Sequence, residues 1–230
     1  HWDRDEYKSV AREYANFPKF SLPRSLVNSL GGNLPILLLT PFFSLSEIGY
    51  FGMALTLGFR PLNMISASLY QTFFQQTAER VNNRTSIAAF FKQFITKTLL
   101  IAVPVFVGMW FILPWLTGWL LGTGWSATGE LIRVLMPWLL MSLIVAPISF
   151  LSDVFGKQKK ALVFEIAFLL SRLVGLGVGL MMHNFYWAIV GYSIGGALVI
   201  ACQLIWLMSL VKNRQNMGKK LNENLFPKEA

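Results

Sequence analysis

The sequence has few of the residues on which enzymes most often rely for chemistry. It contains one cysteine, Cys202, which excludes a disulfide within the chain, and two histidines, His1 and His183. It contains no Cys/His spacing typical of a zinc site and no glycine-rich loop with a phosphate-binding lysine. The sequence therefore predicts a protein that is not an enzyme and that carries no metal ion or organic cofactor.

Charged residues are also scarce, at 13% of the 230 residues, whereas hydrophobic residues make up 54%. Soluble domains contain about 25% charged residues. The charges stand in short groups between apolar runs, and a helix needs about 20 apolar residues to cross a bilayer. Six runs have the required length, at 21–43, 48–78, 98–121, 131–155, 161–182 and 187–211.

These runs predict an all-α fold, a polytopic membrane bundle of six spans. Spanning segments must satisfy their backbone hydrogen bonds internally, so the alternatives are helices and closed β-barrels. Barrel strands alternate apolar and polar residues over about ten positions, and residues 197–210 show no such alternation. We expect a cytoplasmic N-terminal arm at 1–20, a six-helix lobe at 21–211 and a basic cytoplasmic tail at 212–230. Because the chain begins at His1 inside a polar segment, we interpret it as a fragment of a longer protein or a processed product.

Lysine and arginine are distributed unevenly among the segments that flank the runs. They occur in the arm, the tail and the second and fourth connections, whereas the connections around Glu47, Gly124 and Asn184 contain none. The basic residues are Arg4, Lys8, Arg12, Lys19, Arg80, Arg84, Lys92, Lys97, Lys157, Lys159, Lys160, Lys212, Arg214, Lys219, Lys220 and Lys228. Cytoplasmic loops carry such an excess, so both chain ends are expected in the cytoplasm. The net charge of +9 is divided among four segments, which favours anionic membrane lipids as partners over nucleic acid.

Prolines and glycines inside the runs predict bent, closely packed helices. Each proline removes a backbone hydrogen bond and tends to bend its helix. The prolines concerned are Pro35, Pro61, Pro104, Pro114, Pro137 and Pro147. Glycines four residues apart, such as Gly175 and Gly179, allow two helices to approach closely. We therefore expect another helix against the face that carries Gly175 and Gly179.

Polar residues at membrane depth mark the candidate binding site. In the second run, Thr56, Arg60, Asn63 and Gln71 follow helical spacing and share one face. A charge at the centre of a span costs about 2.5–3.5 kcal/mol on insertion scales, and such residues usually face a cavity or the bundle interior. Arg60 lies near the middle of its run, so we expect it to line a cavity. Pro61 directly follows it and is expected to break the helix locally and direct Arg60 into that cavity.

The first and fifth runs carry further arginines at depth. Arg24 and Asn28 share a face in the first run, and Arg172 lies midway along the fifth. A cavity lined by these arginines would be cationic and would suit a phosphate-bearing substrate, because a guanidinium binds phosphate through paired hydrogen bonds. For Arg172, a structural ion pair inside the bundle is an open alternative. The predicted substrate-binding residues are Arg60, Arg24, Asn28, Asn63, Gln71 and Arg172.

Eight short segments, taken in order, carry a resemblance to a known family. They are 17–23 (FPKFSLP), 33–39 (NLPILLL), 48–51 (IGYF), 60–62 (RPL), 71–75 (QTFFQ), 136–138 (MPW), 146–148 (API) and 156–158 (GKQ). In order and spacing they resemble the second half of Wzx-type polysaccharide flippases, over roughly 14–210 of this chain. Those flippases belong to the multidrug/oligosaccharidyl-lipid/polysaccharide exporter superfamily.

The resemblance implies a substrate, partners and a location. Members have two six-helix lobes around a central cavity, and they flip undecaprenyl-diphosphate-linked sugar repeats outward by alternating access. This chain would be the C-terminal lobe in a bacterial inner membrane, serving lipopolysaccharide, capsule or exopolysaccharide synthesis. Its implied partners are the lipid-linked oligosaccharide diphosphate, membrane lipids, the missing N-terminal lobe and other polysaccharide-assembly proteins.

Two alternatives remain open. The chain could belong to another exporter of the same superfamily, one that carries drugs or a lipid-linked peptidoglycan precursor. It could also belong to a membrane enzyme that polymerises or ligates lipid-linked glycans. A polymerase is expected to have a sizeable outward loop with basic residues, and the sequence has no such loop.

Overall fold

The computed structural model describes residues 16–82 and 87–225, and this part of the chain forms helices without any strand. The long helices are α2 (Asn16–Leu39), α3 (Leu45–Asn82), α4 (Ile87–Leu121), α5 (Ser126–Val145), α7 (Gln158–Met181) and α8 (Phe185–Leu225). Shorter turns are η1 (Thr123–Trp125), η2 (Ala146–Ile148) and α6 (Leu151–Val154). The all-α prediction is confirmed. Most of the predicted arm, to residue 15, and Arg84 lie outside the described residues.

Four helical segments are long and apolar enough to cross a membrane, which identifies a membrane protein. They are α4, the segment Thr123–Val154 that contains α5, then α7, and α8 as far as Asn213. Helices α2 and α3 are also long, but they are not among these four apolar segments, and they carry the polar residues Arg24, Asn28, Arg60 and Asn63. The six-span prediction is therefore confirmed for four spans and stays a prediction for α2 and α3.

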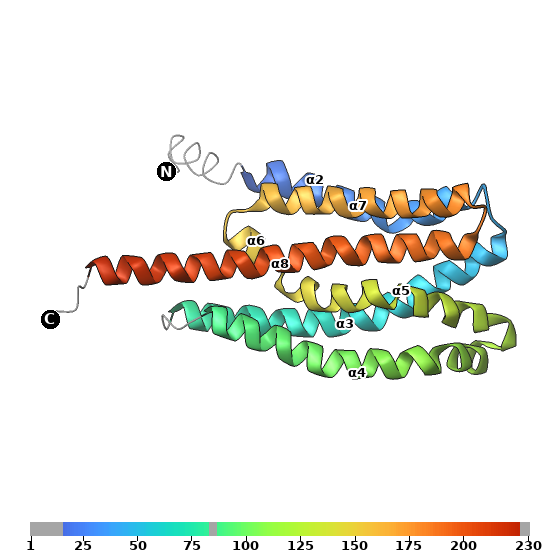
Figure 1. Cartoon of the computed structure of the whole chain (residues 1–230), viewed down its shortest axis with the longest axis horizontal. Coiled ribbons are helices and arrows are strands. Elements are labelled where there is room, and N and C mark those ends of the chain that lie inside the picture. Colours follow the sequence, from blue (N-terminus) through green and yellow to red (C-terminus); the bar gives the residue numbers. More distant parts are fainter. Residues whose placement is uncertain (1–15, 83–86, 226–230) are drawn as a thin grey trace, which may run out of the picture.

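Helices α8 and α5 form the middle of the bundle (Figure 1). Helix α8 packs against α7, α5 and α4, and α5 packs in addition against α3. Helix α2 lies along α7 and diverges from α3 beyond the turn that joins them (Figure 1). The core contains fully buried side chains from most of these helices, among them Phe51 of α3, Leu135 of α5, Leu176 of α7 and Tyr192 of α8. The divergence of α2 and α3 leaves space in front of α5 and α8.

The connections separate into two ends of the bundle (Figure 1). One end of the bundle contains the start of α2, the passage from α3 to α4, the passage from α6 to α7 and the end of α8. The other three connections lie at the opposite end. Lys92, Lys157, Lys159 and Lys160 belong to the first end. The alternation that the basic residues predicted is thus present in the fold. Which end faces the cytoplasm stays a prediction.

Two helices differ from their predicted form at a proline. Helix α3 runs without interruption through Pro61, so the expected local break is wrong. One missing hydrogen bond can be accommodated within a long membrane helix. The fourth run is broken instead, because α5 ends at Val145 and the chain turns through η2, where Pro147 stands, before α6. Proline suits the first turn of a helix, where its missing N–H costs nothing.

Helices α7 and α8 approach each other closely at the predicted glycine pair. A Cβ atom added to Gly175 would lie 2.3 Å from the backbone of Gly191. At Gly179 it would lie 2.1 Å from the Cα atom of Ala188. No side chain fits at either position, so the prediction of a helix against this face is confirmed.

Candidate functional site

A cavity of about 760 Å³ lies between α2, α3, α5, α7 and α8. It is the space left where α2 and α3 diverge. Polar and charged side chains from every one of these helices line it, which is unusual for a bundle whose outer surface is largely apolar. They are Arg24, Asn28, Thr56, Arg60, Asn63, Ser142, Ser149, Glu165, Arg172 and Gln203.

Five of the six predicted site residues line this one cavity. Arg24 and Asn28 come from α2, Arg60 and Asn63 from α3, and Arg172 from α7. The sixth, Gln71, is exposed on α3 and is not among the lining residues. It shares the helical face of Arg60 but lies eleven positions further on, about 16 Å along the helix axis at 1.5 Å per residue. Sequence spacing gave the correct face and could not give the length of the cavity.

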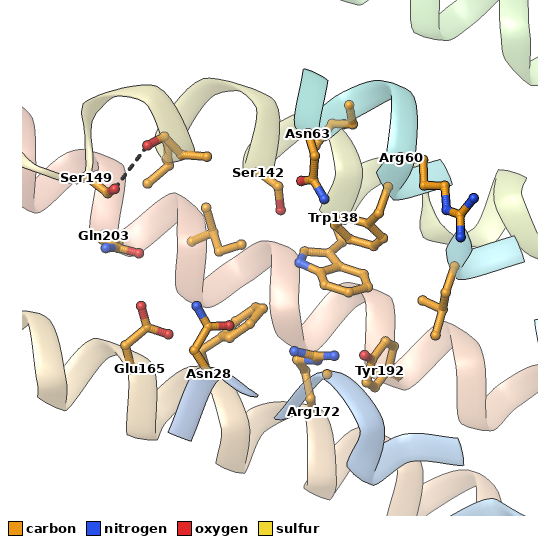
Figure 2. A pocket seen from close by; sticks show the side chains of 18 of the residues that line it. Asn28, Arg60, Asn63, Trp138, Ser142, Ser149, Glu165, Arg172, Tyr192 and Gln203 are labelled. Atoms are coloured by element: carbon orange, nitrogen blue, oxygen red, sulfur yellow. Dashed lines mark hydrogen bonds between the residues drawn. The ribbon is translucent and has the colours of Figure 1, made fainter. Parts of the chain in front are cut away.

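Arg60 is the exposed arginine of this cavity, and it has no ion-pair partner among the described residues. Its side chain is exposed, and it reaches inward from α3 opposite Arg172 and Tyr192 (Figure 2). Asn63, almost one turn later, points toward the same space from the same helix (Figure 2). A guanidinium without an ion pair and a side-chain amide on the same helix offer several donors to an oxygen-rich, anionic ligand.

Arg24, by contrast, is already paired with two carboxylates. Its Nη1 lies 3.3 Å from Asp153 Oδ2, and its Nε lies 3.4 Å from Glu165 Oε1. These contacts tie α2 to both α6 and α7. Glu165 also lines the cavity and neutralises part of its charge, but three arginines face this one carboxylate, so the lining is cationic in sum. Among the described residues, the arginines of this lining without a paired carboxylate are Arg60 and Arg172.

Arg172 lies against aromatic rings and forms no ion pair among the described residues. Its Cζ atom lies 4.5 Å from the ring centre of Trp138, 4.6 Å from that of Phe168 and 4.1 Å from that of Tyr192. Its Nη2 donates to the carbonyl oxygen of Gly31 on α2 at 3.4 Å. Cation–π contacts of this kind stabilise a desolvated guanidinium. The alternative of an Arg172 ion pair is thus not what the structure contains.

Sequence reasoning missed the contributions of α5 and α8. Trp138, Ser142 and Ser149 line the cavity from α5 and the turn that follows it, and Gln203 lines it from α8. Ser142 and Ser149 stand four and eleven positions after Trp138, which is one face of a continuous helix over the predicted fourth run, so their spacing was a usable signal. It was hidden because serine is unremarkable in a membrane helix. Their hydroxyl and amide groups extend the hydrogen-bonding surface of the cavity.

The other side of α5 is apolar. A groove of about 620 Å³ between α4, α5 and α8 is lined by residues such as Phe106, Trp110, Leu140 and Leu198. The described residues contain no group of three or more His, Cys, Asp and Glu that could hold a metal ion. Chemically, the polar cavity offers hydrogen-bond donors and acceptors together with the positive charge of its arginines.

Comparison with known proteins assigns a family. A family model described as polysaccharide biosynthesis protein matches residues 6–130, which is more than half of the chain. The matched range includes α2, α3 and α4, and hence Arg24, Asn28, Arg60 and Asn63. Neither the search of curated proteins nor that of solved structures gave a match.

Proposed function

The chain belongs to the polysaccharide biosynthesis protein family, and from this premise we propose that it is one lobe of a membrane flippase. In this proposal it is the C-terminal lobe of a Wzx-type transporter and has six spans. Both of its ends lie on the cytoplasmic side of a bacterial inner membrane. It carries undecaprenyl-diphosphate-linked oligosaccharide repeat units outward, for lipopolysaccharide, capsule or exopolysaccharide synthesis. Transport, and no enzymatic step, is its activity.

The observation that carries this proposal is a polar cavity inside a bundle of apolar helices, with an unpaired arginine in its wall. A charged side chain at membrane depth is costly and usually marks the path of a polar substrate. In our proposal Arg60 binds the diphosphate through paired hydrogen bonds. Asn28 and Asn63 offer amide donors and acceptors to sugar hydroxyls. Arg24 assists from the opposite wall.

The divergence of α2 and α3 supports the proposal that a second lobe completes the cavity. Helices α2 and α3 both line the cavity but contact each other little, and α5, α7 and α8 provide the rest of its lining. A first lobe placed where α2 and α3 diverge would enclose the cavity, and rocking of the two lobes would expose it to each side in turn, as alternating access requires. Further partners in the proposal are membrane lipids at the lysine-rich end and other polysaccharide-assembly proteins.

The test uses the full-length protein in cells that depend on it for glycan export. Arg60→Ala removes the charge, and Arg60→Lys keeps the charge but loses the paired donors of the planar guanidinium. Both variants are expected to reduce export while the amount of protein in the membrane stays normal. Lipid-linked repeat units should then accumulate on the cytoplasmic side. Lys97→Ala, which changes an exposed cation on α4 outside the cavity, is the matched control.

Normal export by Arg60→Ala at a normal protein level would contradict the proposal. A change in glycan chain length, without accumulation of single repeat units, would instead favour a polymerase. Loss of both variants from the membrane would assign Arg60 a structural role.

A further inference from the structure

A proline inside a helix leaves one particular carbonyl group without its hydrogen bond. The N–H of residue i donates to the carbonyl oxygen of residue i−4, and proline has no N–H. Pro35 stands inside α2, so the carbonyl oxygen that loses its donor is that of Gly31. This is the atom to which Arg172 Nη2 donates, at 3.4 Å. Arg172 of α7 thus supplies to α2 the hydrogen bond that Pro35 removes.

The surroundings of Arg172 fix its side chain in this role. The guanidinium is enclosed by the rings of Trp138 on α5, Phe168 on α7 and Tyr192 on α8. A Cβ atom added to Gly196 on α8 would lie 3.5 Å from Arg172 Cδ, so this glycine borders the aliphatic stem. The one side chain therefore connects α2, α5, α7 and α8.

The same arrangement occurs a second time in the bundle. Pro114 stands inside α4 and removes the donor of the Trp110 carbonyl oxygen. Arg133 on α5 donates to that oxygen through its Nε. In both cases an arginine of a neighbouring helix completes the hydrogen bond that a proline leaves open. The second instance supports the interpretation that Arg172 compensates for the donor that Pro35 removes.

We propose that Arg172 is a positioning residue, which holds the proline-containing segment of α2 against α7 and thereby places Arg24 and Asn28 in the cavity wall. It acts through α2 and does not bind the substrate directly. This role rests on the proposed function only in taking the cavity as the substrate path. Direct contact between Arg172 and the substrate is disfavoured because Arg172 is buried: its side chain is 5% exposed, and its Nε atom is enclosed without a hydrogen-bond partner.

The experiment follows the packing of α2 by cysteine accessibility in the full-length protein. The native Cys202, exposed on α8 and outside the cavity, is first replaced by serine. Val27, half-buried on α2 one turn before Gly31, is replaced by cysteine as the reporter. Arg172→Met removes the donor, so α2 separates from α7 more often. Alkylation of the reporter by a maleimide should become about 5- to 30-fold faster, the change in equilibrium that one lost hydrogen bond produces.

Pro35→Ala provides the decisive second step. Alanine restores the N–H that bonds to the Gly31 carbonyl oxygen, so in this background Arg172→Met should leave alkylation near its original rate. Pro23→Ala is the matched control on the same helix, since it restores a donor for residue 19 and not for residue 31. Arg172→Lys keeps a charged donor and should also preserve slow alkylation. A cysteine at Leu69, half-buried on α3, should react at an unchanged rate throughout.

Unchanged alkylation in Arg172→Met, or an increase that Pro35→Ala does not reverse, would overturn the proposal. If Arg172→Met does not accumulate in the membrane, its abundance becomes the readout. Recovery of the protein with Pro35→Ala and not with Pro23→Ala supports the proposal, and recovery with neither contradicts it. No substrate is needed for these measurements, so their outcome is independent of whether the flippase assignment is correct.

Discussion

Arg24 on α2 and Glu165 on α7 form an ion pair of 3.4 Å in the wall of the cavity, although 140 residues separate them in the chain. Asp153 binds the same guanidinium at 3.3 Å. One arginine therefore compensates two carboxylates, at side-chain exposures of 17% for Arg24 and 16% for Glu165. Removing one member of such a group leaves a poorly solvated charge behind, which costs more than the pair itself contributes.

The first prediction follows from this pairing. Arg24→Ala leaves Asp153 and Glu165 next to each other without a cation, and we expect a loss of about 1–3 kcal/mol in the free energy of unfolding. Adding Glu165→Gln removes one of the two uncompensated charges, so the double variant should be more stable than Arg24→Ala alone. Thermal unfolding of the purified protein in detergent measures both. Equal midpoints for the single and double variants would show that the pair is not energetically coupled.

The second prediction concerns the contact of α7 with α8. The methyl carbon that Gly179→Ala introduces would lie 2.1 Å from the Cα atom of Ala188, so α7 and α8 must move apart to accommodate it. Overpacking of this kind costs about 1–3 kcal/mol. Gly177→Ala is the matched control on the same helix, because a Cβ there meets nothing within 4 Å, and alanine favours the helix by up to about 1 kcal/mol. A lower unfolding midpoint is expected for Gly179→Ala alone, and equal midpoints would contradict the close contact.

Helical periodicity was sufficient to predict which residues share the cavity wall within one helix. Arg24 and Asn28 on α2, and Arg60 and Asn63 on α3, were placed on common faces by spacing alone, and they line the cavity. The reason is that spacing along a helix converts directly into direction around its axis. Spacing does not show where along the helix axis the cavity ends, because a helix face extends beyond any one cavity. Gln71 therefore lies on the predicted face of α3 but outside the cavity.

Partners between helices were not predictable in the same way. The sequence left an ion pair of Arg172 open, and Glu165 lies seven positions earlier on the same helix, yet Glu165 pairs with Arg24 of α2. Such pairing depends on how helices that are distant in sequence pack against each other. The proline rule is an intermediate case. It identifies Gly31 and Trp110 as carbonyls in need of a donor, whereas only the fold shows that Arg172 and Arg133 supply it.

The third prediction is topological. Serines at the end of the bundle that lacks basic residues should be accessible from outside the cell, because basic connections remain in the cytoplasm. In a Cys202→Ser background, Ser46→Cys and Ser126→Cys should react with a membrane-impermeant maleimide in intact cells, and Lys159→Cys should react only after permeabilisation. All three positions are exposed and outside the cavity. Reaction of Lys159→Cys in intact cells would show that the orientation is the opposite of the predicted one. Asn83, in the other basic connection, lies outside the described residues.

The last prediction tests whether a proline and an arginine on different helices are energetically coupled. Arg133 donates to the Trp110 carbonyl oxygen that Pro114 leaves without a donor, and also pairs with Glu130 at 3.0 Å. Arg133→Met leaves that oxygen unsatisfied at the helix surface, which should cost about 1–3 kcal/mol. Pro114→Ala supplies an N–H within α4 instead, so the cost of Arg133→Met should be smaller in this background.

A double-mutant cycle on the free energy of unfolding in mixed micelles isolates this coupling, since shared effects on Glu130 cancel. Pro104→Ala provides the control cycle. It restores a donor for residue 100, ten positions before Trp110 and about 15 Å along α4, so its effect should simply add to that of Arg133→Met. Coupling with Pro114 and additivity with Pro104 is the expected pattern. Additivity in both cycles would mean that Arg133 stabilises α4 through its charge alone, and it would also remove the second instance on which the role of Arg172 is built.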